Sequence, residues 1–556
     1  MASVRGILSP CGWGYPPGRF WDDSRATGPG TRTDTSLELS DSLTDSRLHN
    51  QHVTTSRTMK RRITFLVSPQ ENEASEDALR LAKDKLEIKG LKAIREDRFT
   101  FTFDELPQFV KDVVRQTQEL HLRFDNGRNY DEKWKGPFAS RLPLGLHILA
   151  LPLRESKMTN LCSFILKYAD IPCSSIETAF ISRGRLKQLY VPNVDVLPNI
   201  LKPLGNKICG PSQKACKDKV LALSTATSLD LKYDAASQTL DVSAIWATSD
   251  GNSKDGSWDV QIKPDTSADK VEVGVLTSGG KSPEEEISLR GKLAMVGQDD
   301  ELKPALVSFP SRHHARPSIY MADFNRPTGL HPKLEVTLAL GGNSPAAECT
   351  LNAYFTIPQP FFVDPYQLED DKLMKSYGIN KIKVVDGETD LEAPEWAMSK
   401  WGALVLAELD VAQYLSTWEK KRSPMEFTLP LHLRYMSTHP EKHSETATLP
   451  WPMVFWACPS EQWNKMSTNP FDRRMLGYDE YFPEETYFYH LTPKLINSTL
   501  SRSSLEVPIL NSVDSQLIEW GTMGVIVIGF LWVFGTILTS FFGASGKKAE
   551  EHQKKE

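Results

Sequence analysis

A long uncharged stretch near the C-terminus constrains this chain more than any other feature. Residues 521–542 contain no Asp, Glu, Lys or Arg. About 20 apolar residues in a helix cross a hydrocarbon core of roughly 30 Å. A buried soluble helix is the weaker interpretation, because glycine and β-branched residues form helices poorly in water. A cleaved lipid-anchor signal would end in its apolar tail, whereas lysines follow this stretch. We therefore predict one permanent transmembrane helix over 520–543 and a short tail over 544–556.

The charges on either side of the span predict its orientation. Residues 501–520 hold one basic residue, Arg502, whereas the tail holds four lysines. The positive-inside bias places the tail in the cytosol and the body in the lumen. No apolar signal-peptide core is present at either Met1 or Met59, so a tail-anchored protein with a cytosolic body is the alternative. The triplet at Asn497 is an N-glycosylation acceptor that a lumenal body could use, although such triplets also arise by chance.

The cysteines carry a second, weaker indication of compartment. Of the seven cysteines, only Cys11 precedes Met59, which reads as a more natural start of the chain. The even set that remains is typical of an oxidising lumen, but the sequence does not choose among the many pairings. Several reduced, buried thiols are the alternative. No C-x-x-C spacing occurs, so no zinc or redox motif is predicted.

Period-two alternation dominates the rest of the ordered chain and predicts strands. The clearest runs are 240–246, 258–262, 334–340 and 427–435. With 36 prolines and 33 glycines as punctuation, they predict a mainly β protein with antiparallel, sandwich-like lumenal domains, a few helices and one C-terminal transmembrane helix.

Two segments have helical spacing instead. Leu79, Ala82 and Leu86 predict one helix that stops at Gly90, and 106–117 predict a second, amphipathic helix. Residues 365–395 are expected to form an exposed loop.

Composition and pattern together divide the chain into segments. We predict a disordered leader over 1–58, an N-terminal α+β region over 59–215, a β-rich middle region over 216–328, a further β domain over 329–470 and a juxtamembrane segment over 471–519. The net charge of −6 provides no basic field, so nucleic acid is not an expected partner.

The strongest apparent cluster of reactive side chains is the stretch LPLHLRYMSTHPEKH. His432 and Arg434 lie two apart in an alternating strand and therefore share a face. His439 and His443 have i, i+4 spacing, but Pro440 disfavours helical geometry there. H-E-x-x-H, G-x-S-x-G and phosphate-loop motifs are all missing. We predict no catalytic, cofactor-binding or metal-binding residues, and read the stretch as a polar strand face.

A series of short motifs in the C-terminal half resembles the PIG-X/Pbn family, and in particular its fungal branch. In order these are Gly329-Leu330-His331-Pro332, Cys349, Phe361-Phe362-Val363-Asp364-Pro365-Tyr366, Asp390-Leu391-Glu392-Ala393-Pro394, LPLHLRY at 429–435, and Leu449-Pro450-Trp451-Pro452 with Cys458. RRITFLVSPQ and REDRFTFTFDELP, in the N-terminal half, are similar to the same branch. The resemblance covers roughly 59–545 and makes 329–470 a PIG-X-like domain.

The resemblance implies a non-catalytic accessory subunit in the endoplasmic reticulum membrane. Its partner would be the polytopic catalytic subunit of glycosylphosphatidylinositol (GPI) mannosyltransferase I, which adds the first mannose of the GPI anchor from dolichol-phosphate mannose. Family members also support the folding of some secretory proteins, including a vacuolar protease. A general lumenal chaperone and an unrecognised enzyme are the alternatives.

The resemblance also directs attention to particular residues. Cys349 and Cys458 both fall within the family module, and we expect them to form a disulfide. His432 and Arg434 are expected to form either a polar brace or a contact with the enzyme subunit. Gly535 and Thr539 lie four apart in the span, a spacing that permits close helix contact but that is also common in spans.

Overall fold

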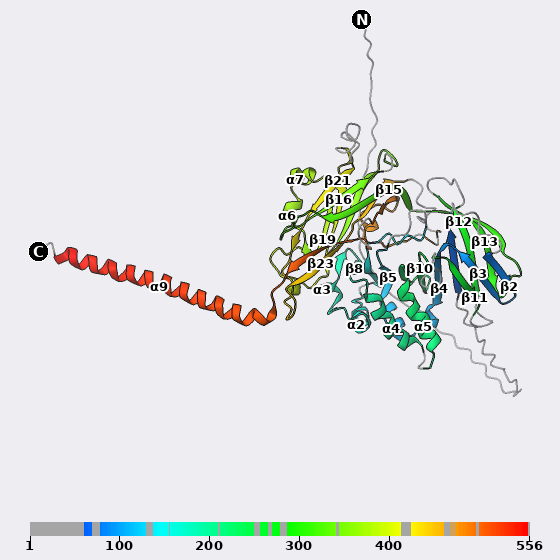
Figure 1. Cartoon of the computed structure of the whole chain (residues 1–556), viewed down its shortest axis with the longest axis horizontal. Coiled ribbons are helices and arrows are strands. Elements are labelled where there is room, and N and C mark those ends of the chain that lie inside the picture. Colours follow the sequence, from blue (N-terminus) through cyan, green and yellow to red (C-terminus); the bar gives the residue numbers. More distant parts are fainter. Residues whose placement is uncertain are drawn as a thin grey trace, which may run out of the picture. The chain divides into compact units, whose positions relative to one another are not determined.

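The structure is a computed structural model that describes residues 60–68, 78–128, 137–154, 156–209, 212–249, 256–264, 270–278, 286–340, 344–412, 424–460, 469, 471, 473–495 and 500–553. These residues belong to one compact unit, Ser56–Glu556. Strands outnumber helices among them (Figure 1). The predicted fold class is therefore confirmed: mainly β, with a few helices and one apolar C-terminal helix. The predicted leader, 1–58, lies outside the described residues.

Eleven strands form the first sheet, in the order β14-β13-β12-β1-β4-β10-β9-β5-β6-β8-β7. Neighbours are antiparallel except β1 and β12, which pair in parallel. Its strands come from both of the predicted segments 59–215 and 216–328. Their bounds are β1 Lys60–Val67, β4 Ala93–Thr102, β5 Thr117–Asp125, β6 Gly145–Pro152, β7 Ile181–Arg183, β8 Leu186–Val191, β9 Ser228–Asp234, β10 Thr239–Trp246, β12 Lys270–Ser278, β13 Glu286–Val296 and β14 Lys303–Pro310.

A small sheet covers one face of this sheet around β1 and β12. Its order is β11-β3-β2, with bounds Trp258–Ile262, Lys85–Leu91 and Leu79–Ala82. Phe65 of β1 meets Trp258 edge-on, with ring centroids 6.2 Å apart. Leu86 and Ile88 of β3 are buried in the same core. This end of the molecule is thus a β-sandwich.

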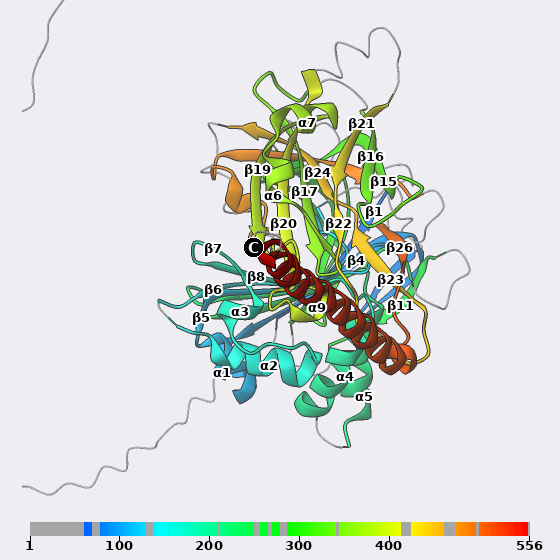
Figure 2. The same cartoon turned by 90° about the vertical axis from the view of Figure 1, so that its left-hand side faces the viewer.

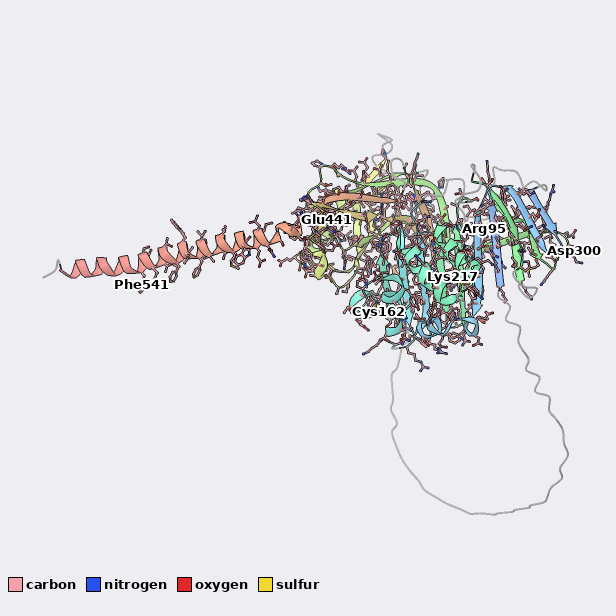
Figure 3. The ribbon with its side chains drawn as sticks, turned by 60° about the horizontal axis from the view of Figure 1, so that its bottom comes forward. Arg95, Cys162, Lys217, Asp300, Glu441 and Phe541 are labelled. Atoms are coloured by element: carbon pink, nitrogen blue, oxygen red, sulfur yellow. A yellow bond between two sulfur atoms is a disulfide. The ribbon has the colours of Figure 1, made fainter. Side chains whose placement is uncertain are left out.

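Helices cover another part of the first sheet, around β5, β6, β9 and β10. They are α1 Gln108–Val114, α2 Thr159–Ala169, α3 Ile176–Ala179, α4 Val196–Ile208 and α5 Lys214–Ala222. Figure 2 shows the resulting layers, with α1, α2, α4 and α5 on one side of β5, β6 and β8 and the second sheet on the other. Disulfides join Cys162 of α2 to Cys173, and Cys209, directly after α4, to Cys216 of α5. Figure 3 labels Cys162 and, on α5, Lys217.

The second sheet has eight strands in the order β19-β20-β17-β24-β25-β15-β16-β21. Their bounds are β15 His313–Phe324, β16 Lys333–Ala339, β17 Thr350–Pro358, β19 Ile379–Gly387, β20 Gly402–Leu409, β21 Met425–Pro430, β24 Met453–Pro459 and β25 Thr486–Pro493. Alternation along β17 divides its side chains between two cores. Phe355 and Ile357 pack into one core, whereas Tyr354 enters the core shared with the first sheet.

Two strand pairs and two short helices cover the outer face of the second sheet. The pairs are β18 Phe361–Phe362 with β22 His432–Leu433, and β23 Ser444–Pro450 with β26 Arg502–Pro508. The helices are α6 Pro365–Leu368 and α7 Asp371–Ser376. On the inner face, the Trp401 indole donates to the Gln188 carbonyl of β8 at 2.9 Å, which ties the two sheets together.

The C-terminal helix, α9, runs from Ser515 to Gln553. Within the described part of the chain, it is the one helix long and apolar enough to cross a membrane, over Ser515–Phe541, where an 18-residue window has a mean hydropathy of 2.1. None of this stretch is buried against the rest of the protein. An exposed apolar helix of this length is what a single membrane anchor requires.

Two local predictions from the sequence were wrong, and a third was right in type but too long. The helix predicted from Leu79 to Gly90 is the hairpin of β2 and β3, in which Leu79 and Leu81 lie opposite Ile88 and Leu86. The helix predicted over 106–117 is shorter, because α1 ends at Val114 and β5 already begins at Thr117. The predicted loop 365–395 contains α6, α7 and β19, since Asp364 and Asp370 accept backbone hydrogen bonds and cap the two helices.

Candidate functional site

Four of the short motifs in the C-terminal half meet beside β22. The amides of Leu431 and Leu433 donate to the carbonyls of Pro332 and Leu330, each at 2.9 Å. On its other side β22 pairs with β18, so that Phe362 lies opposite His432. The strand therefore lies between the Gly329–Pro332 and Phe361–Tyr366 segments. Residues more than one hundred apart in sequence, such as His331 and His432, become neighbours in this way.

Phe362 lies at the centre of this cluster, between two polar side chains. The His432 ring stacks on it with centroids 5.0 Å apart, and the Arg434 guanidinium lies 4.4 Å from its centroid. His432 also contacts the His331 ring, with their Nδ1 atoms 2.7 Å apart. We call His331, Phe362, Ala393, His432 and Arg434 the motif cluster.

The two histidines can share one proton but not carry two. A hydrogen bond between two Nδ1 atoms needs one donor and one acceptor, so at least one ring is neutral. Burial, and next the neighbouring His331, lower the pKa of His432. The outer nitrogen of His432 faces the Gln367 side-chain oxygen at 3.3 Å. The pair is therefore suited to structure and hydrogen bonding rather than to holding charge.

Arg434 connects the cluster to the Asp390–Pro394 segment. Its side chain is buried, and its Nη1 donates to the Ala393 carbonyl at 2.8 Å. The Asp390 carboxylate accepts from the amides of Glu392 and Ala393 at 2.8 and 2.9 Å, which closes the turn. The Glu395 amide then donates to the Tyr435 carbonyl at 3.0 Å. Arg434 thus has the geometry of a brace that fixes the turn against the strand.

Large apolar side chains stand exposed around the motif cluster. Each lies in or next to one of the motifs, and each is between 41% and 76% exposed. They are Leu330, Tyr366, Leu391, Trp396 and Tyr435, which we call the motif rim. Contiguous exposed apolar patches mark contact surfaces, and aromatic residues are enriched where such contacts are strongest. The motif rim is therefore a candidate contact region next to the motif cluster.

Across the described residues, no three His, Cys, Asp or Glu side chains gather as a metal site would require. His439 Nδ1 accepts from the Glu441 amide at 3.2 Å, and His443 is exposed. The arrangement supports recognition by shape and by aromatic contact.

Comparison with known proteins identifies the group to which this chain is related. A family profile described as PIG-X / PBN1 matches residues 327–538. Protein pbn1 of Emericella nidulans is 38% identical over 85% of this chain and 95% of its own length. Protein pbn1 of Aspergillus oryzae is 36% identical over 90% of this chain and 100% of its own, and that of Neurospora crassa is 32% identical over 89% and 97%. The chain belongs to the PIG-X/PBN1 family.

The part that matches the PIG-X/PBN1 profile includes the motif cluster, the motif rim and most of the apolar stretch of α9. It also includes Cys349 and Cys458, which the structure joins by a disulfide with Cα atoms 4.2 Å apart. β17 begins directly after Cys349 and pairs with β24, which contains Cys458. Sheet pairing therefore brings the two cysteines together. Asn497 lies outside the described residues.

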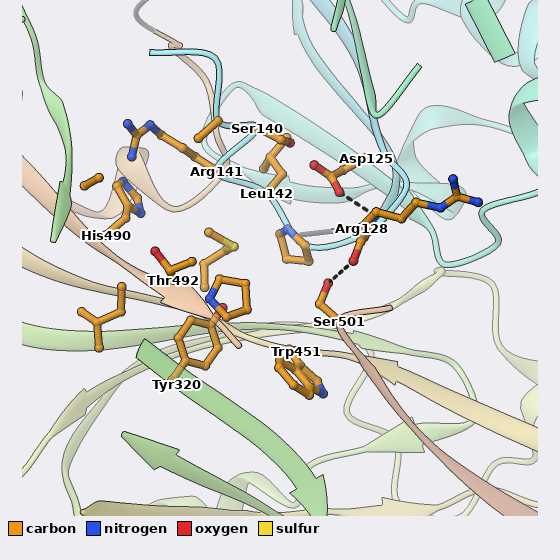
Figure 4. Close-up of a pocket in the computed structure, with 17 residues that line it drawn as sticks. Asp125, Arg128, Ser140, Arg141, Leu142, Tyr320, Trp451, His490, Thr492 and Ser501 are labelled. Carbon is orange, nitrogen blue, oxygen red and sulfur yellow. Dashed lines mark hydrogen bonds between the residues drawn. The ribbon is translucent and has the colours of Figure 1, made fainter. Parts of the chain in front are cut away.

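A second group of buried polar residues lies between the two sheets. Figure 4 shows Asp125, Arg141, Tyr320 and His490 around a pocket of about 110 Å³. Burial raises the pKa of Asp125 to about 6, and its carboxylate accepts from the Gly127 amide at 2.7 Å. Arg141 donates to the carbonyls of two residues of β15. Ligand pockets usually exceed about 300 Å³, so this pocket is small for a substrate. The polar residues around it connect the two sheets by hydrogen bonds.

Sequence reasoning found His432 and Arg434 of the motif cluster but not their partners. Phe362 and His331 were noticed only as parts of motifs, and Trp396 of the motif rim was missed. The available signal was the order of the motifs, because segments that share one family module tend to share one site. No periodicity could have indicated that Arg434 reaches a carbonyl 41 residues away.

Proposed function

We propose that this protein is a non-catalytic accessory subunit that stabilises the polytopic catalytic subunit of GPI mannosyltransferase I in the endoplasmic reticulum membrane. Its large body would lie in the lumen and its short tail in the cytosol. Membership of the PIG-X/PBN1 family supports this role. The main structural support for this role is the motif rim, the set of exposed apolar side chains that lie next to the motif cluster.

The single span supports a partner rather than an enzyme. Transfer from a lipid-linked sugar needs a site open to the bilayer and enclosed by several spans, whereas one candidate span occurs among the described residues. Within this span, no atom other than the helix's own backbone lies within 4 Å of the place that a Cβ would occupy at Gly535. Gly535 and Thr539 lie four residues apart, and small residues at this spacing let helices approach closely. The span and the rim would together contact one partner.

The rim is tested by adding charge where it should meet the partner. The rim variant is the tagged full chain that carries both Trp396→Asp and Tyr435→Asp. It would be expressed in cells that lack the unmodified protein, and the amount of mannosyltransferase catalytic subunit that copurifies with it would be measured. Loss of aromatic anchors typically costs about 2 kcal/mol or more of binding, so recovery and steady-state level of that subunit should fall several-fold. Substitutions at exposed positions change folding stability little, within about 0.5 kcal/mol.

Leu306→Asp provides the matched control, because Leu306 is also exposed but lies on β14 of the first sheet. It should leave recovery unchanged. Equal recovery from the rim variant and the control would contradict the proposal. Recovery of many unfolded secretory proteins in place of one stoichiometric partner would favour the general chaperone instead.

A further inference from the structure

An apolar cavity lies beneath the helices of the N-terminal half. Its volume is about 730 Å³, and it is lined by α1, α2, α4 and α5 on one side and by β4, β5, β9 and β10 on the other. Protein interiors pack as densely as organic crystals, and few of their voids exceed the size of a water molecule. The volume falls within the range of about 300–1,000 Å³ that is usual for ligand pockets.

The floor of the cavity is the middle of the first sheet, where burial is unexpectedly incomplete. Leu231, Leu240 and Val242 are only partly buried although helices cover this face. Such positions in the centre of a covered sheet are normally fully buried. The helices therefore stand away from the strands at this point.

Contacts among the helices hold them in this position. Phe109 of α1 stacks on Phe164 of α2, with centroids 6.4 Å apart. On the other side, the disulfide between Cys209 and Cys216 joins α4 to α5. Because each helix is fixed to its neighbour, the cavity is a built feature rather than a packing defect. Ile208, which lines the cavity, is 50% exposed, so the cavity reaches the surface there.

The lining determines what class of molecule fits. Its ionisable side chains are Glu105 and Lys219, and every other lining residue is apolar or, at Cys216, disulfide-bonded. Glu105 already accepts from the Thr102 amide at 2.7 Å. A peptide placed inside would bury backbone amides without partners, which is costly, whereas a hydrocarbon chain has no such groups.

We propose that this cavity binds one acyl chain of a membrane phospholipid. The span over Ser515–Phe541 attaches the body to a bilayer, so phospholipid is the most abundant apolar molecule within reach. The site lies outside residues 327–538, which match the family profile, and does not depend on the proposed role with the mannosyltransferase. Binding would give the N-terminal half a direct contact with lipid.

Photolabelling of the full chain tests this site. The purified protein, in nanodiscs containing phosphatidylcholine with a diazirine on one acyl chain, would be irradiated and its labelled peptides identified by mass spectrometry. We expect labels on β9, β10, α4 or α5. Labels confined to α9 would overturn the proposal, because they would report only the bilayer around the span.

Variants that fill the cavity provide the second measurement. Val242→Trp on β10 and Leu204→Trp on α4 add bulk at partly buried positions facing the cavity. Each should reduce labelling at these elements at least fivefold without lowering the melting temperature. Leu306→Trp, at an exposed position on β14, should leave the labelling unchanged.

Undiminished labelling of both folded variants would refute the site. If one variant fails to fold, the other and the peptide map of the unmodified chain still decide. Labelling of the same elements by diazirine-bearing palmitic acid but not by the phospholipid, or by an apolar photoreactive peptide alone, would also overturn the proposal.

Discussion

His121 on β5 shows how strongly burial can control one side chain. It is fully buried, its Nδ1 lies 2.9 Å from Arg123 Nη2, and its Nε2 lies 3.4 Å from a Glu119 carboxylate oxygen. Burial first, and the adjacent Arg123 next, lower the pKa of His121 to about 4. The folded protein therefore keeps this ring neutral at pH values where the unfolded chain takes up a proton.

This difference predicts a pH dependence of stability between pH 6.5 and about 4. As pH falls through this window, the unfolded state binds a proton that the folded state does not, so the stability that depends on His121 falls by at most about 1.36 kcal/mol per pH unit. Burial also lowers the pKa of His147 and of His314 to about 4, so His121→Gln should reduce the slope rather than remove it. The measurement is the thermal midpoint of the full chain in detergent at pH 4.5, 5.5 and 6.5.

His443→Gln is the matched control for this experiment, because His443 is exposed. It should retain the slope of the unmodified protein. If His121→Gln showed the same slope as His443→Gln, the His121 ring would not contribute to the pH dependence. Absolute stability is not the readout, since removing a buried ring also changes packing.

The pattern Leu-His-Leu-Arg-aromatic occurs at both 120–124 and 431–435, and its two copies have different surroundings. In the first, Arg123 pairs with Asp230 at 3.2 Å and donates to the Met475 carbonyl at 2.8 Å. In the second, Arg434 lies over Phe362. Period-two alternation predicts that His and Arg share a face, but their partners come from other parts of the chain. The sequence could therefore predict a polar face, and a brace as one of two roles for it, but not the groups that Arg434 contacts.

Among the elements, strands were predicted better than helices because several strands bury one clear face. The runs at 240–246, 258–262 and 334–340 correspond closely to β10, β11 and β16. The hairpin of β2 and β3 was mistaken for a helix because Leu79, Ala82 and Leu86 also match a helical period. Contacts with β1, which are distant in sequence, decide that case. The cavity below α4 and α5 was likewise unpredictable, since it depends on how far the helices stand from the sheet.

The pairing of Cys349 with Cys458 gives a prediction for two strands together. Because β17 and β24 are adjacent, Cys349→Ser and Cys458→Ser should open the same loop and cause the same mobility shift on a nonreducing gel. The double variant should shift no further. Reduction should abolish all the differences, which serves as the internal control.

A different shift for each single variant would mean that each cysteine bonds to another partner. Cys162→Ser offers a comparison within the same chain, because its disulfide with Cys173 closes a much shorter loop. Its mobility shift should be smaller than that of either C-terminal variant.

At the scale of the whole molecule, the apolar cavity has room for an occupant, and the membrane anchor brings the protein to a source of lipid. The cavity reaches the surface at Ile208, so solvent or a ligand can enter it. Water gains little against an apolar lining, whereas burial of a hydrocarbon chain is favourable by roughly 25 cal/mol per Å² of apolar surface. The apolar lining therefore favours a ligand over water. A body attached to a bilayer by α9 has lipid available for that purpose.

Topology decides which membrane face and which partners the body can reach, and Asn497 provides the direct test. The acceptor triplet at Asn497 precedes the apolar stretch that begins at Ser515. If the body is lumenal, we expect a glycan on Asn497 that endoglycosidase H removes, and loss of that glycan in Asn497→Gln. Asn511→Gln is the control, because Asn511 is followed by Ser-Val and forms no acceptor triplet. In sealed microsomes, protease added outside should remove only the tail. Digestion of the body together with a chain that lacks the glycan would place the body in the cytosol and would contradict the proposed lumenal orientation.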